Sequence, residues 1–280
     1  LAKAYNDALF GGLKQAGLQV IPIDTFGILQ EIVANPGAYG FSNVSGTACQ
    51  PQVTAQSLTC TPLNYVTPNA ADTYVFADGV HPTTAAHQIL GQYSISVLEG
   101  PRLQHVLTHS AQTTGRARAA QVGGHLAGRP ADGMSWWGNV RGDMQRYDHA
   151  NLYDGMAPAG LFGIDWARDG MVVGGFAGYG RMDADFGNSM GDFTQSDTTL
   201  GVFAGWYGDR AWVNGQASYS WLGYDVTRKV QLGPATREHK GSPDGSNLAV
   251  ALDAGYEFGQ QGGCRHGPVA GVVWQKVKLD

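Results

Sequence analysis

The segment Tyr74–Thr83, YVFADGVHPT, contains the pair of residues in this sequence that is best suited to chemistry. Asp78 and His81 are three positions apart, with Gly79 between them and Pro82 directly after. Gly and Pro indicate a turn, in which a carboxylate can lie against an imidazole, fix its tautomer and stabilise the imidazolium. The pair therefore predicts the acid–base half of a hydrolytic triad, in which Asp78 orients His81 and His81 takes the proton of a nucleophile.

A simpler explanation exists for the same two residues, because D-x-x-H spacing also occurs where ordinary helices begin. His81 would then be a surface residue and Asp78 a turn former. His87 lies nearby and could complete a metal site with them, although a structural histidine on a helix is the more common case. The whole block D-G-V-H-P-T, with an aromatic extended run before it, is more specific than the spacing alone and favours the triad.

Alternating helical and extended segments should position this pair. Before it, the patterns predict a helix, an apolar run, a second helix and a loop rich in Gly, Pro, Ser, Asn and Thr, at Tyr5–Ala16, Leu18–Ile23, Phe26–Ala34 and onward to about Asp72. After it, Thr83–Glu99 has apolar residues near helical spacing, and Gly100-Pro101 supplies a stop. These signals are typical of the end of an α/β domain.

A second, polar helix is expected over Arg102–Leu126, where good helix formers carry only a thin apolar stripe. Such a helix would be poorly buried in an ordinary core. It is typical either of a solvated linker between domains or of a helix that passes through a water-filled barrel. Gly123-Gly124, Gly128 and Pro130 should end it.

From Met134 onward the apolar residues alternate with a period of two, most clearly in Ala211–Tyr224. We expect seven strands, near residues 134–147, 158–168, 171–186, 194–208, 211–227, 245–259 and 267–278. The strands are long, since soluble strands average about 5–6 residues. Tight turns alternate with the longer connections 148–157, 187–193 and 228–244, as in outer-membrane barrels. A soluble sandwich or lipocalin-like barrel would also alternate, but strand length, glycine content and loop asymmetry favour the membrane barrel.

The composition limits the class of protein further. The 280 residues include 41 glycines and only 15% charged residues, whereas soluble domains average about 25% charged. A net charge of −5 without a run of Lys or Arg argues against nucleic acid as a partner. The chain starts without Met or a signal peptide, and seven strands leave an open edge in lipid. We therefore expect the sequence to be a fragment of a longer protein.

Two of the three cysteines are placed to form a disulfide in an oxidising compartment. Cys49 and Cys60 flank a polar loop at a spacing that suits a local disulfide. Cys264 has no evident partner and is expected to be a turn residue.

The block around Asp78 and His81 resembles the last conserved block of the GDSL, or SGNH, hydrolase family, in which the Asp and His are catalytic. The upstream segments Val20–Phe26 and Asn35–Asn43 are similar to the late strand, helix and loop of these enzymes. With a polar helix and a β-barrel after it, the chain resembles the autotransporter branch of the family, whose esterase passenger stays tethered at the cell surface.

This resemblance implies a fold, a location and a set of partners. It implies an α/β fold for residues 1–100 (the C-terminal part of an SGNH hydrolase), a linker helix through the barrel for 101–130, and an incomplete antiparallel transmembrane β-barrel for 131–280. About seven of about twelve strands would be present. It further implies a bacterial outer-membrane location with the passenger at the cell surface. The expected partners are outer-membrane lipid, the barrel-assembly machinery and an ester or lipid substrate. No cofactor or metal is expected.

The chain departs from the family in lacking a Gly-Asp-Ser block, an oxyanion Gly and a Gly-x-Asn-Asp segment. We therefore expect the nucleophilic Ser to lie outside these residues and the fragment alone to be inactive. Gly187–Gly191 matches G-x-S-x-G, but it joins two predicted strands, whereas a nucleophile elbow joins a strand to a helix. The competing hypotheses are a barrel that anchors a non-catalytic adhesin-like or porin-like passenger, and a soluble secreted esterase with a β accessory domain.

Charged residues in the predicted barrel suggest one further contact. Arg181, Asp183 and Asp185 alternate with apolar residues on one strand, and Arg116 and Arg118 lie on the polar helix. We expect the two acids, with Arg181, to line the lumen and pair with the helix arginines.

Overall fold

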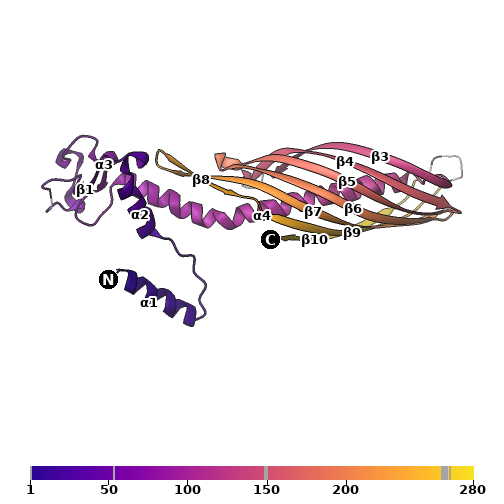
Figure 1. The fold of residues 1–280 in the computed structure, drawn as a ribbon, viewed down its shortest axis with the longest axis horizontal. Coiled ribbons are helices and arrows are strands. Elements are labelled where there is room, and N and C mark those ends of the chain that lie inside the picture. Colours follow the sequence, from indigo (N-terminus) through magenta and orange to yellow (C-terminus); the bar gives the residue numbers. More distant parts are fainter. Residues whose placement is uncertain (1, 53, 148–150, 260–263, 265) are drawn as a thin grey trace. The chain divides into compact units, whose positions relative to one another are not determined.

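The computed structural model describes residues 2–52, 54–147, 151–259, 264 and 266–280. The chain divides into two compact units (Figure 1). The first comprises Leu1–Pro101 and Val230–Arg237, and the second comprises Arg102–Lys229 and Glu238–Asp280.

The first unit is built from short helices around a small parallel sheet. Its elements are α1 (Ala2–Gln15), α2 (Thr25–Ala34), η1 (Pro36–Tyr39), β1 (Asn43–Thr47), η2 (Ser57–Thr59), η3 (Pro62–Asn64), α3 (Ala70–Thr73), β2 (Tyr74–Phe76) and the start of α4 (Thr84–Ala127). Strand β1 pairs with β2 in parallel. The core of this unit lies between α2, β2 and α4, and includes Ile28, Ile32, Val75, Ala86 and Ile89.

Both helices predicted before the Asp–His block are confirmed, as α1 and α2. Asp24 caps α2, since its carboxylate accepts a hydrogen bond from the N–H of Gly27 at 2.8 Å. The expected strand near Val20–Phe26 is wrong: residues 18–23 are irregular and exposed. A strand needs a neighbour for its backbone groups, and among the described residues of this unit's 1–101 segment β1 pairs only with β2.

Two further predictions for this part of the chain need correction. The segment predicted as a loop up to Asp72 contains strand β1, whose residues NVSGT lack an apolar alternation that could have revealed it. The stop at Gly100-Pro101 is also wrong, because α4 continues from Thr84 to Ala127 with Pro101 inside it. Proline removes one backbone donor, and a helix with long flanking segments on both sides tolerates that loss.

The second unit contains an antiparallel sheet of long strands. All seven predicted strands are present, as β3 (Gly133–Tyr147), β4 (Tyr153–Arg168), β5 (Met171–Phe186), β6 (Gly191–Tyr207), β7 (Ala211–Leu232), β9 (Asp244–Tyr256) and β10 (Val269–Leu279). The predicted connection 228–244 also contains β8 (Ala235–Gly241), which pairs with β7. Part of the predicted loop 148–157 lies outside the described residues, and β4 begins before that loop was expected to end.

The sheet order is β10-β9-β7-β6-β5-β4-β3, so neighbours in sequence are neighbours in space and the sheet is not closed. The polar helix lies along its inner face (Figure 1), and strands on both sides reach it with hydrogen bonds. Gln216 Nε2 donates to the carbonyl of Ala119 at 2.9 Å, and Tyr224 Oη donates to the carbonyl of Leu107 at 3.1 Å. The helix is therefore buried against polar side chains of the sheet and is not a solvated linker, which explains its thin apolar stripe.

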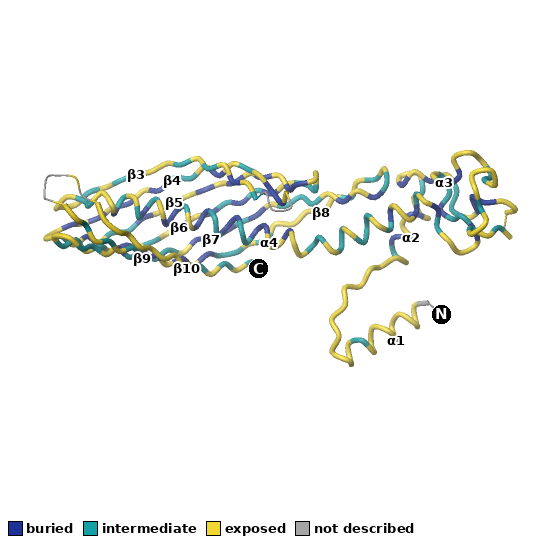
Figure 2. Tube along the Cα trace, turned by 180° about the vertical axis from the view of Figure 1, so that it is seen from behind, coloured by how far each residue is buried: buried dark blue, intermediate teal, exposed yellow. Residues whose placement is uncertain are grey.

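The outer face of the sheet carries an apolar band. Buried and exposed residues alternate along the strands (Figure 2). On β5 the outward side chains of Met171, Val173 and Tyr179 are apolar and exposed. The band crosses to the neighbouring strands at the same height, because Met171 pairs with Trp206, and Trp206 pairs with Val213. The Met171–Tyr179 stretch spans about 20 Å once strand tilt is included, close to the band of outer-membrane barrels.

The predicted pairing of lumen acids with helix arginines is wrong. Arg181 and Asp183 pair with each other on the outer face, with their side chains 54% and 63% exposed, and Asp185 is exposed as well. On β5 the outward positions become polar beyond Tyr179, where the apolar band ends, so the acids face water outside the sheet rather than the helix. Arg118 instead pairs with Asp197 of β6.

Within the described residues, no helix has the length and apolar character required to cross a membrane.

Candidate active site

The turn that carries Asp78 and His81 connects β2 to α4 and is closed by backbone hydrogen bonds. The N–H of Ala77 donates to the carbonyl of His81 at 2.8 Å, and the N–H of Thr83 donates to the carbonyl of Val75 at 2.9 Å. The Thr83 hydroxyl also donates to the carbonyl of Tyr74 at 2.6 Å. Strand and helix are thus joined at a fixed angle, and the residues between them have a defined geometry.

The two side chains meet as the spacing predicts. His81 Nδ1 lies 2.9 Å from Asp78 Oδ1 and 2.8 Å from Oδ2. The Asp78 side chain is only 5% exposed, whereas that of His81 is 60% exposed. With the Nδ1 proton donated to the carboxylate, Nε2 is the nitrogen that accepts a proton. The arrangement can therefore present a base toward solvent while its orienting acid stays buried.

Three backbone N–H groups hold the Asp78 carboxylate in its charged form. Those of Val80 and His81 donate to Oδ1 at 2.9 and 2.8 Å, and that of Ser57 donates to Oδ2 at 2.8 Å. The Val80, His81 and Ser57 amides, in that order, keep the pKa of Asp78 well below its usual range, and burial opposes them only in part. The carboxylate is therefore available as an anion to stabilise an imidazolium.

This pKa predicts a pH-dependent contribution of Asp78 to stability. A carboxyl group whose pKa is lowered in the folded state stabilises that state above its unfolded pKa, about 3.9, and loses the contribution as the pH falls further. In the full-length protein, Asp78→Asn should lower the urea midpoint of the helical circular dichroism signal at pH 5–7, whereas the difference should shrink below about pH 4. A difference of the same size at pH 3 would contradict this account.

Ser57 reaches Asp78 because a disulfide closes the loop that carries it. The predicted bridge is confirmed: Cys49 and Cys60 are bonded, with their Cα atoms 5.9 Å apart. Sequence analysis missed Ser57, since a backbone N–H leaves no signal in residue types. The flanking cysteines were the one clue that this loop is held against another part of the fold.

Removal of the bridge should destabilise this unit. A closed loop of this size contributes about 3 kcal/mol through the entropy of the unfolded chain. We expect Cys49→Ser/Cys60→Ser to lose that much stability and to become sensitive to proteases between residues 50 and 59 in the full-length protein. Reducing agent should have the same effect on the native protein and none on the variant. Equal protease resistance of variant and native loops would contradict the prediction.

The other candidates do not join the Asp–His pair. The Nδ1 atom of His87 lies 3.1 Å from the carbonyl oxygen of Thr83. Among the described residues, no group of three or more His, Cys, Asp or Glu could hold a metal ion. Gly187–Ser189 forms a 3-10 turn between β5 and β6, so the G-x-S-x-G match is not a strand-to-helix elbow, as predicted. Cys264 is free and exposed.

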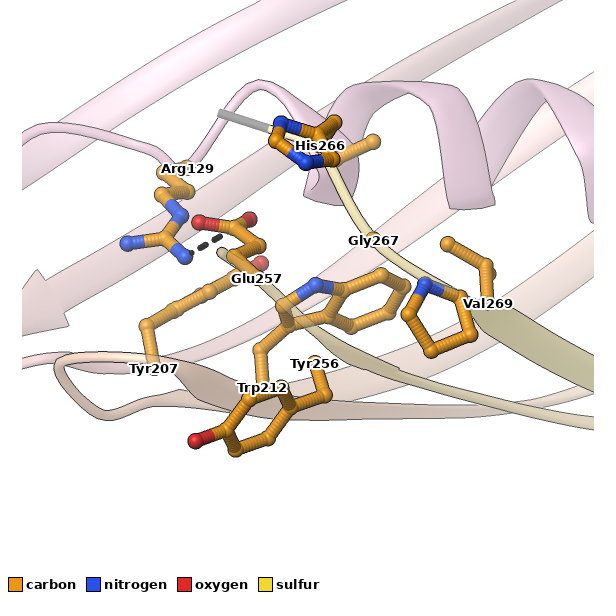
Figure 3. A pocket seen from close by; sticks show the side chains of 10 residues that line it. Arg129, Tyr207, Trp212, Tyr256, Glu257, His266, Gly267 and Val269 are labelled. Carbon is orange, nitrogen blue, oxygen red and sulfur yellow. Dashed lines mark ion pairs between the residues drawn. The ribbon is translucent and has the colours of Figure 1, made fainter. Parts of the chain in front are cut away.

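A pocket in the second unit, near the end of α4, is lined by residues that hold the helix end in place (Figure 3). Arg129 and Glu257 point toward each other across it and form an ion pair at 2.9 Å. The guanidinium carbon of Arg129 lies 5.5 Å from the centroid of the Tyr207 ring, and Tyr207 Oη donates to the carbonyl of Leu126 at 2.5 Å. These contacts fasten the end of the helix to the sheet, and the pocket lining contains no Ser, Thr or Cys.

Long antiparallel strands with an apolar outer band and a polar helix inside define the class of outer-membrane β-barrel proteins. The family described as "Autotransporter beta-domain" matches residues 136–280, just over half of the 280 residues. The chain therefore belongs to the autotransporter family. Its sheet is an outer-membrane element, and its passenger is at the cell surface.

Two curated relatives match nearly the whole chain. "Lipase 1" of Photorhabdus luminescens is 27% identical over 271 residues, which cover 94% of this chain and 40% of the relative. "Esterase EstA" of Pseudomonas aeruginosa is 28% identical over 283 residues, which cover 93% and 42%. The chain thus spans less than half the length of these relatives. The predicted assignment to esterase-type autotransporters is confirmed as a relationship.

Two further similarities concern the separate parts of the chain. A protein named "GDSL esterase/lipase" from Arabidopsis thaliana is 35% identical over 74 residues, which cover 26% of this chain and 20% of the relative. The crystal structure of the β domain of the Bordetella autotransporter BrkA is 19% identical and covers 52% of this chain and 60% of that chain, with a TM-score of 0.44.

Proposed function

We propose that the whole protein is a carboxylic ester hydrolase of the outer membrane that acts by a Ser-His-Asp mechanism. The observation that carries the proposal is the exposed His81 imidazole, held through Nδ1 by the buried Asp78 carboxylate. In this proposal residues 1–100 are the C-terminal part of an SGNH-type α/β passenger. Residues 101–130 contain the part of α4 that passes through the barrel, and residues 131–280 form part of the barrel.

In the proposed reaction a serine from outside these 280 residues attacks the ester carbonyl. His81 Nε2 accepts the serine proton as the tetrahedral intermediate forms and returns it to the departing alcohol. Water then attacks the acyl-enzyme, with His81 again taking the proton and passing it to the serine. Asp78 holds the imidazole in the required tautomer and stabilises its charged form throughout. Oxyanion donors would come from the same outside part of the protein.

The names and lengths of the relatives support a nucleophile outside this chain. Relatives named lipase and esterase are more than twice as long as the matched part. Their names favour esters or lipids as the substrate class, and the resemblance to SGNH hydrolases favours short acyl esters among them. The apolar outer band would contact outer-membrane lipid, and insertion of the strands would use the barrel-assembly machinery.

A serine-directed probe tests the proposal without a choice of substrate. Intact cells that display the full-length protein are treated with a fluorescent fluorophosphonate, which reacts preferentially with activated serines. We expect one labelled serine, in the part of the full-length protein N-terminal to Leu1. The label should be lost when cells are first treated with an unlabelled inhibitor of serine esterases. Absence of any labelled serine in surface-displayed protein would overturn the proposal and favour a barrel that anchors a non-catalytic passenger.

A further inference from the structure

The tip of the β7–β8 hairpin, residues 230–237, belongs to the first unit although the strands that lead to it belong to the second. The pairing of β7 with β6 ends at Arg228, and its pairing with β9 ends at Gly223. Beyond Arg228 the two hairpin strands pair, among the described residues, only with each other. An isolated hairpin of this kind is marginally stable in water, so its apolar side chains need another surface.

That surface is the core of the first unit. Leu232 is fully buried and Val230 is 6% exposed, and both belong to the apolar cluster of Ile28, Ile32 and Ile89. Neither strand of a two-stranded ribbon could bury a leucine completely by itself. The hairpin tip therefore completes a core that α2, β2 and α4 leave open.

The turn of the hairpin fits closely against the same elements. Gly233 has a φ of +62°, and a side chain there would begin 3.0 Å from the Cδ1 atom of Ile89. Its N–H donates to Gln92 Oε1 at 2.6 Å. Pro234 Cγ lies 3.1 Å from where a side chain of Gly40, whose φ is +86°, would begin. Glycine is required on both sides of this contact, which is the mark of a fitted interface.

An ion pair closes the contact at its edge. Arg237 Nη2 donates to Glu31 Oε2 at 2.5 Å, and the Tyr39 hydroxyl donates to the other oxygen of the same carboxylate. The hydroxyl of Tyr39 and then Arg237 hold the pKa of Glu31 below its usual range, against burial. The tip thus contacts α2 by charge and α4 by packing and a hydrogen bond.

We infer that the hairpin tip 230–237 is a structural component of the passenger fold and positions His81. It contacts Ile89 and Gln92, which lie on the first turns of α4, and that helix begins three residues after His81. Fixing these turns fixes the position from which the imidazole extends. The structural role stands independently of the chemistry, whereas the positioning role rests on the proposed ester hydrolysis.

The test uses the full-length protein in outer membranes with Leu232→Asp, which places a charge in the core. We expect the cleavage rate of the segment 24–42 by an added protease to rise at least tenfold, while the heat-modifiable gel migration of the barrel stays native. Turnover of a nitrophenyl ester should show a lower kcat with little change in KM, since in the proposed mechanism His81 acts in the chemical steps and not in binding the ester. Leu232→Met should restore both properties, because it conserves volume and polarity.

His239→Asp is the matched control, since it introduces the same single negative charge on β8 beyond the tip, at an exposed position. It should behave as native. If Leu232→Asp does not reach the surface, Glu31→Gln and Arg237→Gln provide a milder pair, each with an increase in cleavage of about two- to fivefold and no further increase when combined.

The outcomes separate the two roles. A native cleavage rate for Leu232→Asp at the surface would overturn the structural inference. Faster cleavage with native kcat would overturn the positioning role. Failure of the proposed hydrolase would appear differently, as absence of ester turnover and of a labelled serine in the native protein itself.

Discussion

His81→Ala in the full-length protein is expected to lower kcat for nitrophenyl-ester hydrolysis by about 10⁴-fold or more, with little change in KM. In the proposed mechanism the imidazole transfers protons only in the chemical steps, so its loss would remove stabilisation of the transition state and not of the bound ester. The measurement is steady-state turnover on cells or membranes, normalised to the amount of surface-exposed protein.

The matched control for this experiment is His87→Ala. His87 lies on the same first turns of α4, and its contact is with the carbonyl of Thr83. A change of no more than about threefold is expected, as for substitutions away from buried or functional contacts. If His81→Ala retained native turnover, the Asp78–His81 pair would be a structural feature of the turn, and the proposed mechanism would be wrong.

Arg118→Met should strongly destabilise the second unit, because Arg118 of α4 pairs with Asp197 of the sheet. Arg118 and Asp197 are paired with side chains only 5% and 4% exposed, and Arg118 Nη1 also donates to Ser220 Oγ at 2.8 Å. Removing the cation leaves an uncompensated buried carboxylate, which costs about 3–5 kcal/mol. The midpoint of heat-modifiable migration in detergent should then fall by about 10 °C.

Two further variants distinguish the effect of breaking the buried ion pair from the effect of removing any positive charge. Arg118→Met/Asp197→Leu should regain most of the lost stability, because it removes both charges together. Arg181→Gln should leave the midpoint within about 2 °C of native, since its partner Asp183 is exposed on the outer face. An equal fall for Arg118→Met and Arg181→Gln would contradict the assignment of Arg118 to the inner face.

Much of the candidate site could be predicted because its information is local. Asp78 and His81 lie within one turn, and Gly79 and Pro82 allow few conformations for the backbone between them. The contribution of Ser57 could not be predicted, because its N–H reaches Asp78 from 21 positions away and any residue other than proline could supply it.

The long strands could be predicted for a similar reason. The side of the sheet on which their charged residues lie could not. Alternation with a period of two identifies a strand and separates its two faces, but it does not say which face is inside. Polarity alone therefore predicts Arg181, Asp183 and Asp185 in the lumen. Only the three-dimensional arrangement showed that β5 extends past the apolar band, where the outer face meets water.

By itself, the sequence determined the contact of Asp78 with His81, the disulfide, the seven long strands and the relationship to autotransporters of the esterase type, because each leaves a pattern of residue types that can be read along the chain. The tertiary structure alone decided that α4 is one helix through Pro101, that Arg118 pairs with Asp197, and that Leu232 completes the core of the first unit. The ion pair and the core contact depend on side chains that are distant in the chain and meet only when the chain folds, so no local pattern can encode them.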